Sequence, residues 1–195
     1  MFDVREAKRR AVRTALSDAA RHLVLERGLD EVTVEDIAGA AGLSTRTFFN
    51  YFPSKDDAII GLEPTLITEF TASLRDRPGT ETPAQALHAV IFDRADPDSV
   101  PRLWEQHNEL VHRHPALFPR YLAYMAEIES EVAAVIAERI GVDPSSDPRP
   151  RALVGSAFAV LRVAVSWWLD SDRTESLIDV TDRTYRALVG DLNDP

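Results

Sequence analysis

The sequence predicts an all-α protein of about nine helices, with a small N-terminal domain over residues 1–55 and a larger helical domain over residues 56–195. Two observations carry this prediction. Apolar residues recur at three- and four-residue spacing along most of the chain, which is the period of an amphipathic helix. Breaks that contain Gly or Pro divide this pattern into segments of helix length, and no alternating strand pattern competes with it.

The first helix is predicted to begin near Glu6 and to turn Val12, Leu16 and Leu23 inward, and Gly28 is expected to end it. Its start is basic, because five cations outnumber the two acids within the first 17 residues: Arg5, Lys8, Arg9, Arg10 and Arg13. Such a cluster is either a solvated helix start or an arm that contacts phosphate. Both interpretations stay open.

Two short helices follow, joined by a tight turn. Thr33 stands just before Val34 with Asp36 three residues on, a near capping box that predicts a helix start. Gly42 ends that helix after barely two turns, and Ser44 can cap the next one. This arrangement predicts a helix-turn-helix.

The second of these short helices has two different faces. Phe48 and Phe52 are predicted to point into the core. Polar and aromatic groups pair at i, i+4 spacing on the opposite side: Thr45 with Phe49, Arg46 with Asn50, and Thr47 with Tyr51. Pro53 forbids continuation of the helix, and Ser54 is predicted to cap a fourth helix that begins at Lys55.

The remainder reads as further helices. Pro64 predicts a kink or a break near residues 61–64. Pro-rich breaks at 76–83, 96–101 and 143–150 then leave helices near 84–95, 101–113, 115–140, 150–170 and 174–192.

The stretch TVEDIAGAAGLSTRTFFNYFPSK, residues 33–55, resembles the DNA-binding segment of the TetR family of bacterial transcriptional regulators. The resemblance rests on Ile37-Ala38, Ala41-Gly42, Ser44 and the ending Phe52-Pro53-Ser54-Lys55, which occur together at fixed spacing and cover roughly a quarter of the chain with the preceding helix. It implies a three-helix helix-turn-helix DNA-binding domain, and a second helical domain that binds a small ligand and dimerises through its last two long helices, here 150–170 and 174–192.

The resemblance also implies the DNA contacts. It assigns phosphate contacts to Thr33 and Lys55, a cap beside the DNA to Ser44, and major-groove contacts to the outward side chains of the recognition helix: Thr45, Arg46, Thr47, Phe49, Asn50 and Tyr51. Arg46 can donate twice to guanine and Asn50 can pair with the adenine edge. Phe49 departs from the family, which mostly has a phosphate-binding tyrosine there. It can instead touch a thymine methyl or pack against sugar.

Charge does not exclude DNA as a partner. The net charge is -10, but residues 1–57 hold 9 Lys+Arg against 10 Asp+Glu, giving -1, so that -9 falls on residues 58–195. The chain has no Cys, and its charged N-terminus lacks the apolar core of a signal peptide, so we expect a cytoplasmic protein. The apolar run 152–169 carries Arg162 and two serines, which favours a buried helix over a membrane span.

The second domain shows no catalytic motif, no metal-ligand spacing and no cofactor fingerprint, so we expect no enzyme activity, no metal and no cofactor. Aromatic residues on its helices are mostly core, but a few can line an apolar pocket for a hydrophobic effector. The candidates for that pocket are Phe92, Trp104, His107, Tyr121, Tyr124, Met125, Phe158 and Arg162. Arg162 interrupts an apolar run, so it reaches solvent, pairs with an acid or meets an anionic ligand; the first two are favoured.

These observations favour a homodimeric repressor that binds palindromic operator DNA and is released by a small hydrophobic effector. The alternative is an enzyme or small-molecule carrier that keeps a helix-turn-helix only as structure.

Overall fold

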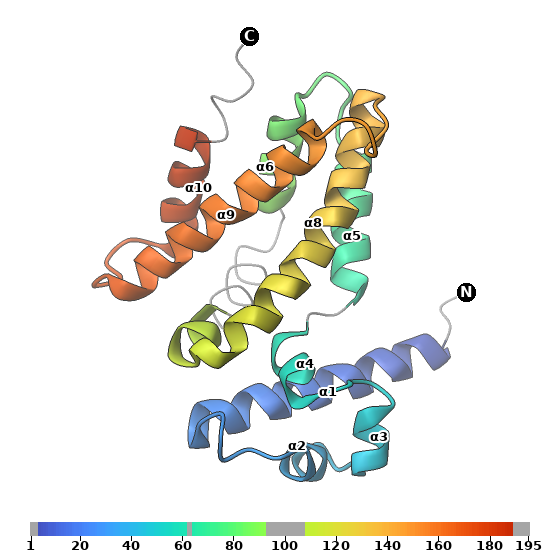
Figure 1. Ribbon diagram of the computed structural model, residues 1–195, viewed down its shortest axis with the longest axis vertical. Helices are drawn as coiled ribbons and strands as arrows, with labels where there is room; N and C mark the ends of the chain where they lie inside the picture. The colour runs from blue at the N-terminus through green and yellow to red at the C-terminus, as the bar shows by residue number, and fades with distance from the viewer. Residues whose placement is uncertain (1–3, 62–63, 93–107, 189–195) are drawn as a thin grey trace. The chain divides into compact units, whose positions relative to one another are not determined.

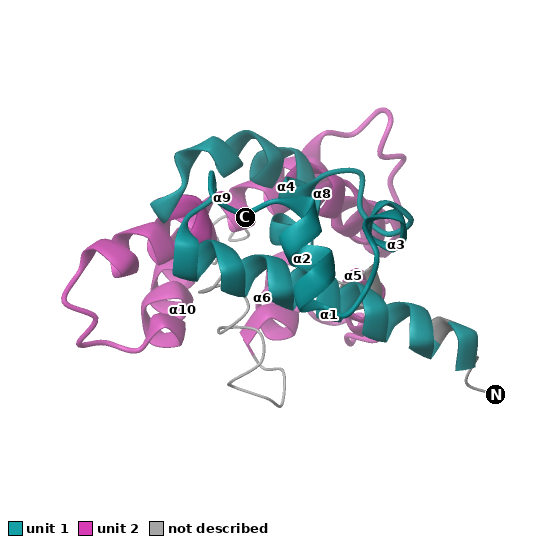
Figure 2. Cartoon of the chain, turned by 90° about the horizontal axis from the view of Figure 1, so that it is seen from below, with its two compact units in different colours: residues 1–66, 113–124 teal, residues 67–112, 125–195 magenta. Residues whose placement is uncertain are grey.

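The computed structural model describes residues 4–61, 64–92 and 108–188, and every regular element within these ranges is a helix (Figure 1). The predicted all-α class is therefore confirmed. The chain forms two compact units, which Figure 2 shows in different colours. Unit 1 holds Met1–Leu66 and Arg113–Tyr124, and unit 2 holds Ile67–His112 and Met125–Pro195.

Unit 1 is built on a long first helix. Helix α1 (Val4–Arg27) packs against α2 (Val34–Ala40) and α4 (Lys55–Ile60), and α2 packs against α3 (Thr45–Phe49) (Figure 1). The 3₁₀ helix η1 (Pro115–Leu117) and the first turns of α8 (Phe118–Ile140) also belong to this unit. Its core includes Leu16, Ile37, Phe48, Phe52 and Ile59, all fully buried. The two inward phenylalanines of the recognition segment are thus confirmed as core residues.

A break separates α4 from the next helix, as the proline predicts. Helix α4 ends at Ile60, Gly61 adopts an extended conformation, and α5 (Pro64–Arg75) begins at the proline itself. Proline is favoured at the first helical position, where its missing N–H has no intrahelical partner to lose. A Cβ added to Gly61 would lie 2.5 Å from the carbonyl oxygen of Asp57, so this crossing requires glycine.

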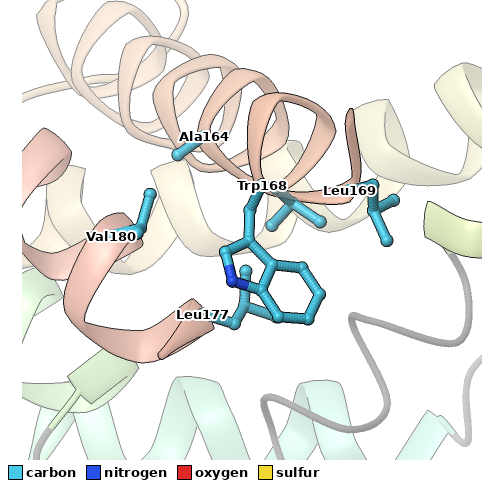
Figure 3. Packing of buried hydrophobic residues seen from close by; sticks show 6 residues of the cluster. Ala164, Trp168, Leu169, Leu177 and Val180 are labelled. Carbon is cyan, nitrogen blue, oxygen red and sulfur yellow. The ribbon is translucent and has the colours of Figure 1, made fainter. Parts of the chain in front are cut away.

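Unit 2 contains α5 from Ile67 on, α6 (Pro83–Phe92), the rest of α8, α9 (Arg149–Asp170) and α10 (Leu177–Leu188). Helix α10 packs against α9 and α6. Figure 3 shows the apolar contact between α9 and α10, which buries Ala164, Val165, Trp168, Leu169, Leu177 and Val180. The Trp168 indole N–H also donates to the carbonyl oxygen of Glu175 over 2.8 Å, which fixes the connection between the two helices.

Several predicted helices differ in extent from the structure. Residues 93–95 of the predicted helix 84–95 lie outside the described residues, and the predicted helix 115–140 begins with the 3₁₀ helix η1. Of the predicted helix 101–113, residues 108–113 are helical and 101–107 lie outside the described residues. Helix α10 begins at Leu177 rather than 174, because the Thr174 hydroxyl donates to the Asp172 carboxylate and holds a turn at that point. Residues 189–192 of its predicted span also lie outside the described part of the chain.

Helix α9 is long and apolar enough to cross a membrane by length and composition, a property that core helices of soluble proteins share. It buries Val154, Ala157, Leu161 and Val165 on one side. Its other side exposes Val163 and Trp167, of which Trp167 is 55% exposed. One face of α9 therefore belongs to the core of unit 2, and an apolar strip on the opposite face is uncovered.

Candidate nucleic-acid interface

The α2–α3 turn forms because glycine and two capping residues act together. Thr33 accepts from the Asp36 N–H at 3.1 Å while the Asp36 carboxylate accepts from the Thr33 N–H at 3.0 Å, so the predicted capping box is present. The bonds from Thr33 lower the pKa of Asp36 below its ordinary value. Gly42 then takes a φ of 69°, which L-residues with a side chain rarely adopt, and lets the chain reverse into α3.

Ser44 starts α3 by accepting from the Thr47 N–H at 3.1 Å, as predicted for a cap. The helix itself ends at Phe49, and Asn50 is its C-terminal cap, so Asn50 and Tyr51 extend the last turn rather than lie inside the helix. The outward side chains are accessible: Arg46, Phe49 and Asn50 are exposed. Phe49 is 57% exposed and packs edge-on against the buried ring of Phe48, with 5.5 Å between ring centroids.

The basic start of α1 meets this surface. Arg5, Lys8 and Arg9 line a groove of about 390 Å³ together with three residues from the end of the helix-turn-helix: Thr47, Asn50 and Tyr51. The groove therefore joins cations, which suit phosphate, to hydrogen-bonding groups that can contact bases. The sequence identifies the basic cluster but does not predict that it lies beside α3, because this contact depends on how α1 packs against the rest of unit 1.

Arg13, from the same basic cluster, is turned inward instead. Its guanidinium lies over the Phe52 ring, 4.2 Å from the centroid, and donates to the Tyr51 carbonyl oxygen at 3.0 Å. The side chain is half-buried, so it is neither a solvated charge nor part of the groove wall. The interpretation of the basic cluster as a solvated helix start therefore does not apply to Arg13.

The two residues assigned to phosphate at helix starts have internal roles as well. The Lys55 ammonium donates to the carbonyl oxygens of Leu29 at 2.6 Å and Val32 at 2.9 Å, which ties α4 to the α1–α2 loop. Thr33 is exposed and forms the capping box. A phosphate contact by either residue stays a prediction, and it would add to these bonds.

The candidate effector residues fall in both units. Trp104 and His107 lie outside the described residues. Tyr121 and Tyr124 are buried in unit 1, and Phe92, Met125, Phe158 and Arg162 belong to unit 2. Phe92 packs against His88 and Tyr185, with ring centroids 4.8 and 5.6 Å apart. Burial of the Tyr185 phenol raises its pKa well above the ordinary range.

Arg162 is half-buried and has an acidic neighbour. Burial raises the pKa of Glu129 on α8, and the charges of Arg162 and Arg151 oppose that rise. A charge partner for Arg162 is therefore present within unit 2, which supports the pairing alternative left open by the sequence. Among the described residues, no group of three or more His, Asp and Glu side chains could hold a metal ion.

An N-terminal helix-turn-helix with an exposed third helix and a basic groove defines the class of helix-turn-helix DNA-binding proteins. Comparison with known proteins narrows this class. Residues 16–59 match the profile of bacterial regulatory proteins of the tetR family, and residues 81–193 match the MftR C-terminal domain of TetR-type regulators. The chain belongs to the TetR family of transcriptional regulators.

Individual relatives agree with this assignment. The HTH-type transcriptional regulator TcmR of Streptomyces glaucescens is 34% identical over 177 residues, which cover 87% of this chain and 78% of TcmR. Two solved structures share the fold. The repressor SmeT of Stenotrophomonas maltophilia has a TM-score of 0.59 at 16% identity, over 92% of this chain and 89% of SmeT. Thermus thermophilus FadR, in complex with lauroyl-CoA, has a TM-score of 0.58 at 20% identity, over 94% and 96% of the two chains.

Proposed function

We propose that this DNA-binding transcriptional regulator is a repressor that binds palindromic operator DNA as a homodimer. Residues 1–55 are the DNA-binding domain in this proposal, and residues 56–195 carry effector binding and dimerisation. The observation that carries the DNA contacts is the groove in which Arg5, Lys8 and Arg9 stand beside Thr47, Asn50 and Tyr51. Phosphate neutralisation and base contact are then available on one continuous surface.

The contacts divide by chemistry. Arg46 donates to guanine O6 and N7, and Asn50 pairs with adenine N6 and N7. Thr45, Thr47 and Tyr51 make the remaining polar contacts of the recognition helix. Phosphates are held by the basic start of α1, by the helix starts at Thr33 and Ser44, and by Lys55.

A dimer is needed because a palindrome presents two half-sites. We infer that a second copy covers the exposed strip of α9, where Val163 and Trp167 stand uncovered, and that α10 completes the interface. Ala159 on the same exposed side is small enough for close helix approach. The two recognition helices would then enter successive major grooves roughly 34–36 Å apart.

The effector is proposed to be a small hydrophobic molecule bound in the second domain, and its binding would release the DNA. The candidates for this site are the residues that the sequence names: Phe92, Trp104, His107, Tyr121, Tyr124, Met125, Phe158 and Arg162. Of these, Phe92 and Phe158 are aromatic side chains of unit 2. The relative FadR was solved with lauroyl-CoA, whose acyl chain is of this hydrophobic class. SmeT and FadR are both described as repressors, which supports the same sign of regulation here. A cytoplasmic location, without a membrane partner, accompanies this proposal.

The deciding experiment is a binding titration with full-length protein and a fluorescein-labelled duplex from the DNA upstream of its own gene. We expect salt-dependent binding to a palindrome in that duplex, lost in Arg46→Ala and retained in a matched control, Arg75→Ala, which removes an exposed arginine of α5. Failure of the native protein to bind such DNA at low salt would favour the alternative, an enzyme or carrier that keeps the helix-turn-helix as structure.

A further inference from the structure

Arg13 connects the basic start of α1 to the end of the recognition segment. The guanidinium covers the Phe52 ring at 4.2 Å and donates through Nη1 to the Tyr51 carbonyl oxygen at 3.0 Å. Its Nη2 also stands close to Gly61, 3.4 Å from where a Cβ would lie. One side chain from α1 therefore contacts the end of the recognition segment and lies near the end of α4.

The position of Arg13 along α1 connects these contacts to the DNA surface. Arg5, Arg9 and Arg13 are spaced four residues apart, so they follow one another along the same side of the helix. Arg5 and Arg9 line the basic groove, and Tyr51 lines it as well. Tyr51 therefore has two roles: it is one of the residues that line the groove, and its backbone carbonyl oxygen accepts the hydrogen bond from Arg13.

We propose that Arg13 is a positioning residue for DNA recognition, which fixes the rotation of α1 against the end of α3 so that the phosphate-binding cations and the base-contacting side chains reach the same stretch of DNA. It does this without touching DNA. The inference rests on the proposed function, since it concerns how that same surface is assembled.

The guanidinium suits this role because it is planar. It can stack on an aromatic ring and donate a hydrogen bond in its own plane at the same time. A lysine ammonium keeps the charge but loses the flat stacking surface. The Phe52 ring is itself fully buried and packs against Phe48 at 5.8 Å, so the stacking partner of Arg13 belongs to the rigid core that supports α3.

The test compares Arg13→Gln with Arg9→Gln in the full-length protein. Kd is measured over a series of salt concentrations, for the labelled upstream duplex and for a shuffled duplex of equal length. Arg9→Gln should lower the salt slope by about 0.9, the amount for one lost phosphate contact. Arg13→Gln should weaken binding to the upstream duplex by roughly tenfold, as expected for a lost charged hydrogen bond, with the slope and the binding to shuffled DNA unchanged.

A merely structural role would not give that pattern, because lost stability changes the melting temperature without changing the ratio of specific to non-specific binding in the folded protein. Arg13→Lys provides the second variant, and it is the deciding one if Arg13→Gln does not fold. We expect Arg13→Lys to lose specific affinity at an unchanged salt slope.

Three results would overturn the positioning role. The first is a salt slope that falls in Arg13→Gln as it does in Arg9→Gln, and the second is a specific affinity of Arg13→Gln equal to that of the native protein. The third is full affinity in Arg13→Lys, because it would show that the positive charge alone is sufficient. Absence of native binding to the upstream duplex would instead refute the proposed function and the positioning role together.

Discussion

The carboxylate of Asp57 in α4 forms an ion pair with the guanidinium of Arg120 in the first turn of α8. The side chain of Asp57 is only 10% exposed, and that of Arg120 is 38% exposed. Asp57 also accepts a bond from the Ser54 hydroxyl at 2.6 Å, so the same carboxylate supports the start of α4. Asp57 lies within the tetR-family match and Arg120 within the C-terminal match, so this pair connects the two family regions inside unit 1.

Replacing Arg120 by Met should destabilise unit 1, because the buried Asp57 carboxylate would lose its counter-charge. We expect a loss of about 1–3 kcal/mol in the free energy of unfolding, lower than for a fully buried pair because Arg120 is partly in solvent. Urea denaturation measures the loss. Asp57→Asn combined with Arg120→Met should recover part of it, whereas additive losses in the double variant would show that the two residues do not interact.

Phe49 should make DNA binding depend on a thymine methyl group. Deoxyuridine in place of thymine removes one methyl from the DNA, and we expect the native protein to bind such an operator about fourfold more weakly at the contacted position, consistent with roughly 0.8 kcal/mol per buried methyl-sized group. Phe49→Ala should be insensitive to the same replacement. Equal sensitivity in both proteins would assign the methyl contact to another residue.

Adding a hydroxyl to the ring of Phe49 tests whether this side chain lies close to a phosphate. Phe49→Tyr restores the residue type that most TetR-family members carry and gives it a donor for phosphate. Affinity for the operator should then rise, and binding to the deoxyuridine duplex should fall less than in the native protein. Unchanged affinity in Phe49→Tyr would place the ring away from the DNA backbone.

Trp167→Glu should shift the protein from dimer to monomer. An exposed tryptophan in an apolar strip is the type of side chain that dominates interfaces, and losing it costs about 2 kcal/mol or more of association energy. Sedimentation velocity over a concentration series measures the shift, with Trp167→Phe as the conservative control. A Trp167→Glu protein that stays dimeric would exclude the exposed face of α9 from the interface.

Glu129→Gln should stabilise the protein at neutral pH. Burial raises the pKa of this carboxyl in the folded state despite Arg162 and Arg151, so the folded protein binds its proton more tightly than the unfolded chain does. The native protein therefore loses stability as the pH rises from the unfolded pKa through the folded one. The urea midpoint of Glu129→Gln should exceed that of the native protein at pH 7. The difference between the two midpoints should shrink at pH values below the ordinary pKa range of glutamate. A lower midpoint at pH 7 would mean that attraction to Arg162 outweighs burial.

Local features were predictable because their causes lie within a few residues of each other. The caps at Thr33, Ser44 and Ser54 all form as the sequence indicates. The inward Phe48 and Phe52 follow from helix periodicity and are buried.

The contacts that assemble the interface could not be predicted, because they join residues far apart in the chain. Arg13 meets Tyr51 across 38 positions, and Lys55 meets Leu29 across 26. The groove beside α3 has the same origin, since its basic wall comes from α1. The assignments of single residues to bases, to phosphates and to an effector stay predictions for the experiments above.

The three cations of the groove also bear on how fast the protein finds its target. The chain carries a net charge of -10, so most of its surface is repelled by DNA, while Arg5, Lys8 and Arg9 attract it. In the proposed function, these charges favour encounters in which the start of α1 approaches the DNA first, within a screening distance of about 8 Å at physiological salt. If the groove binds DNA as proposed, neutralising its cations should lower the association rate as well as shorten the lifetime of the complex.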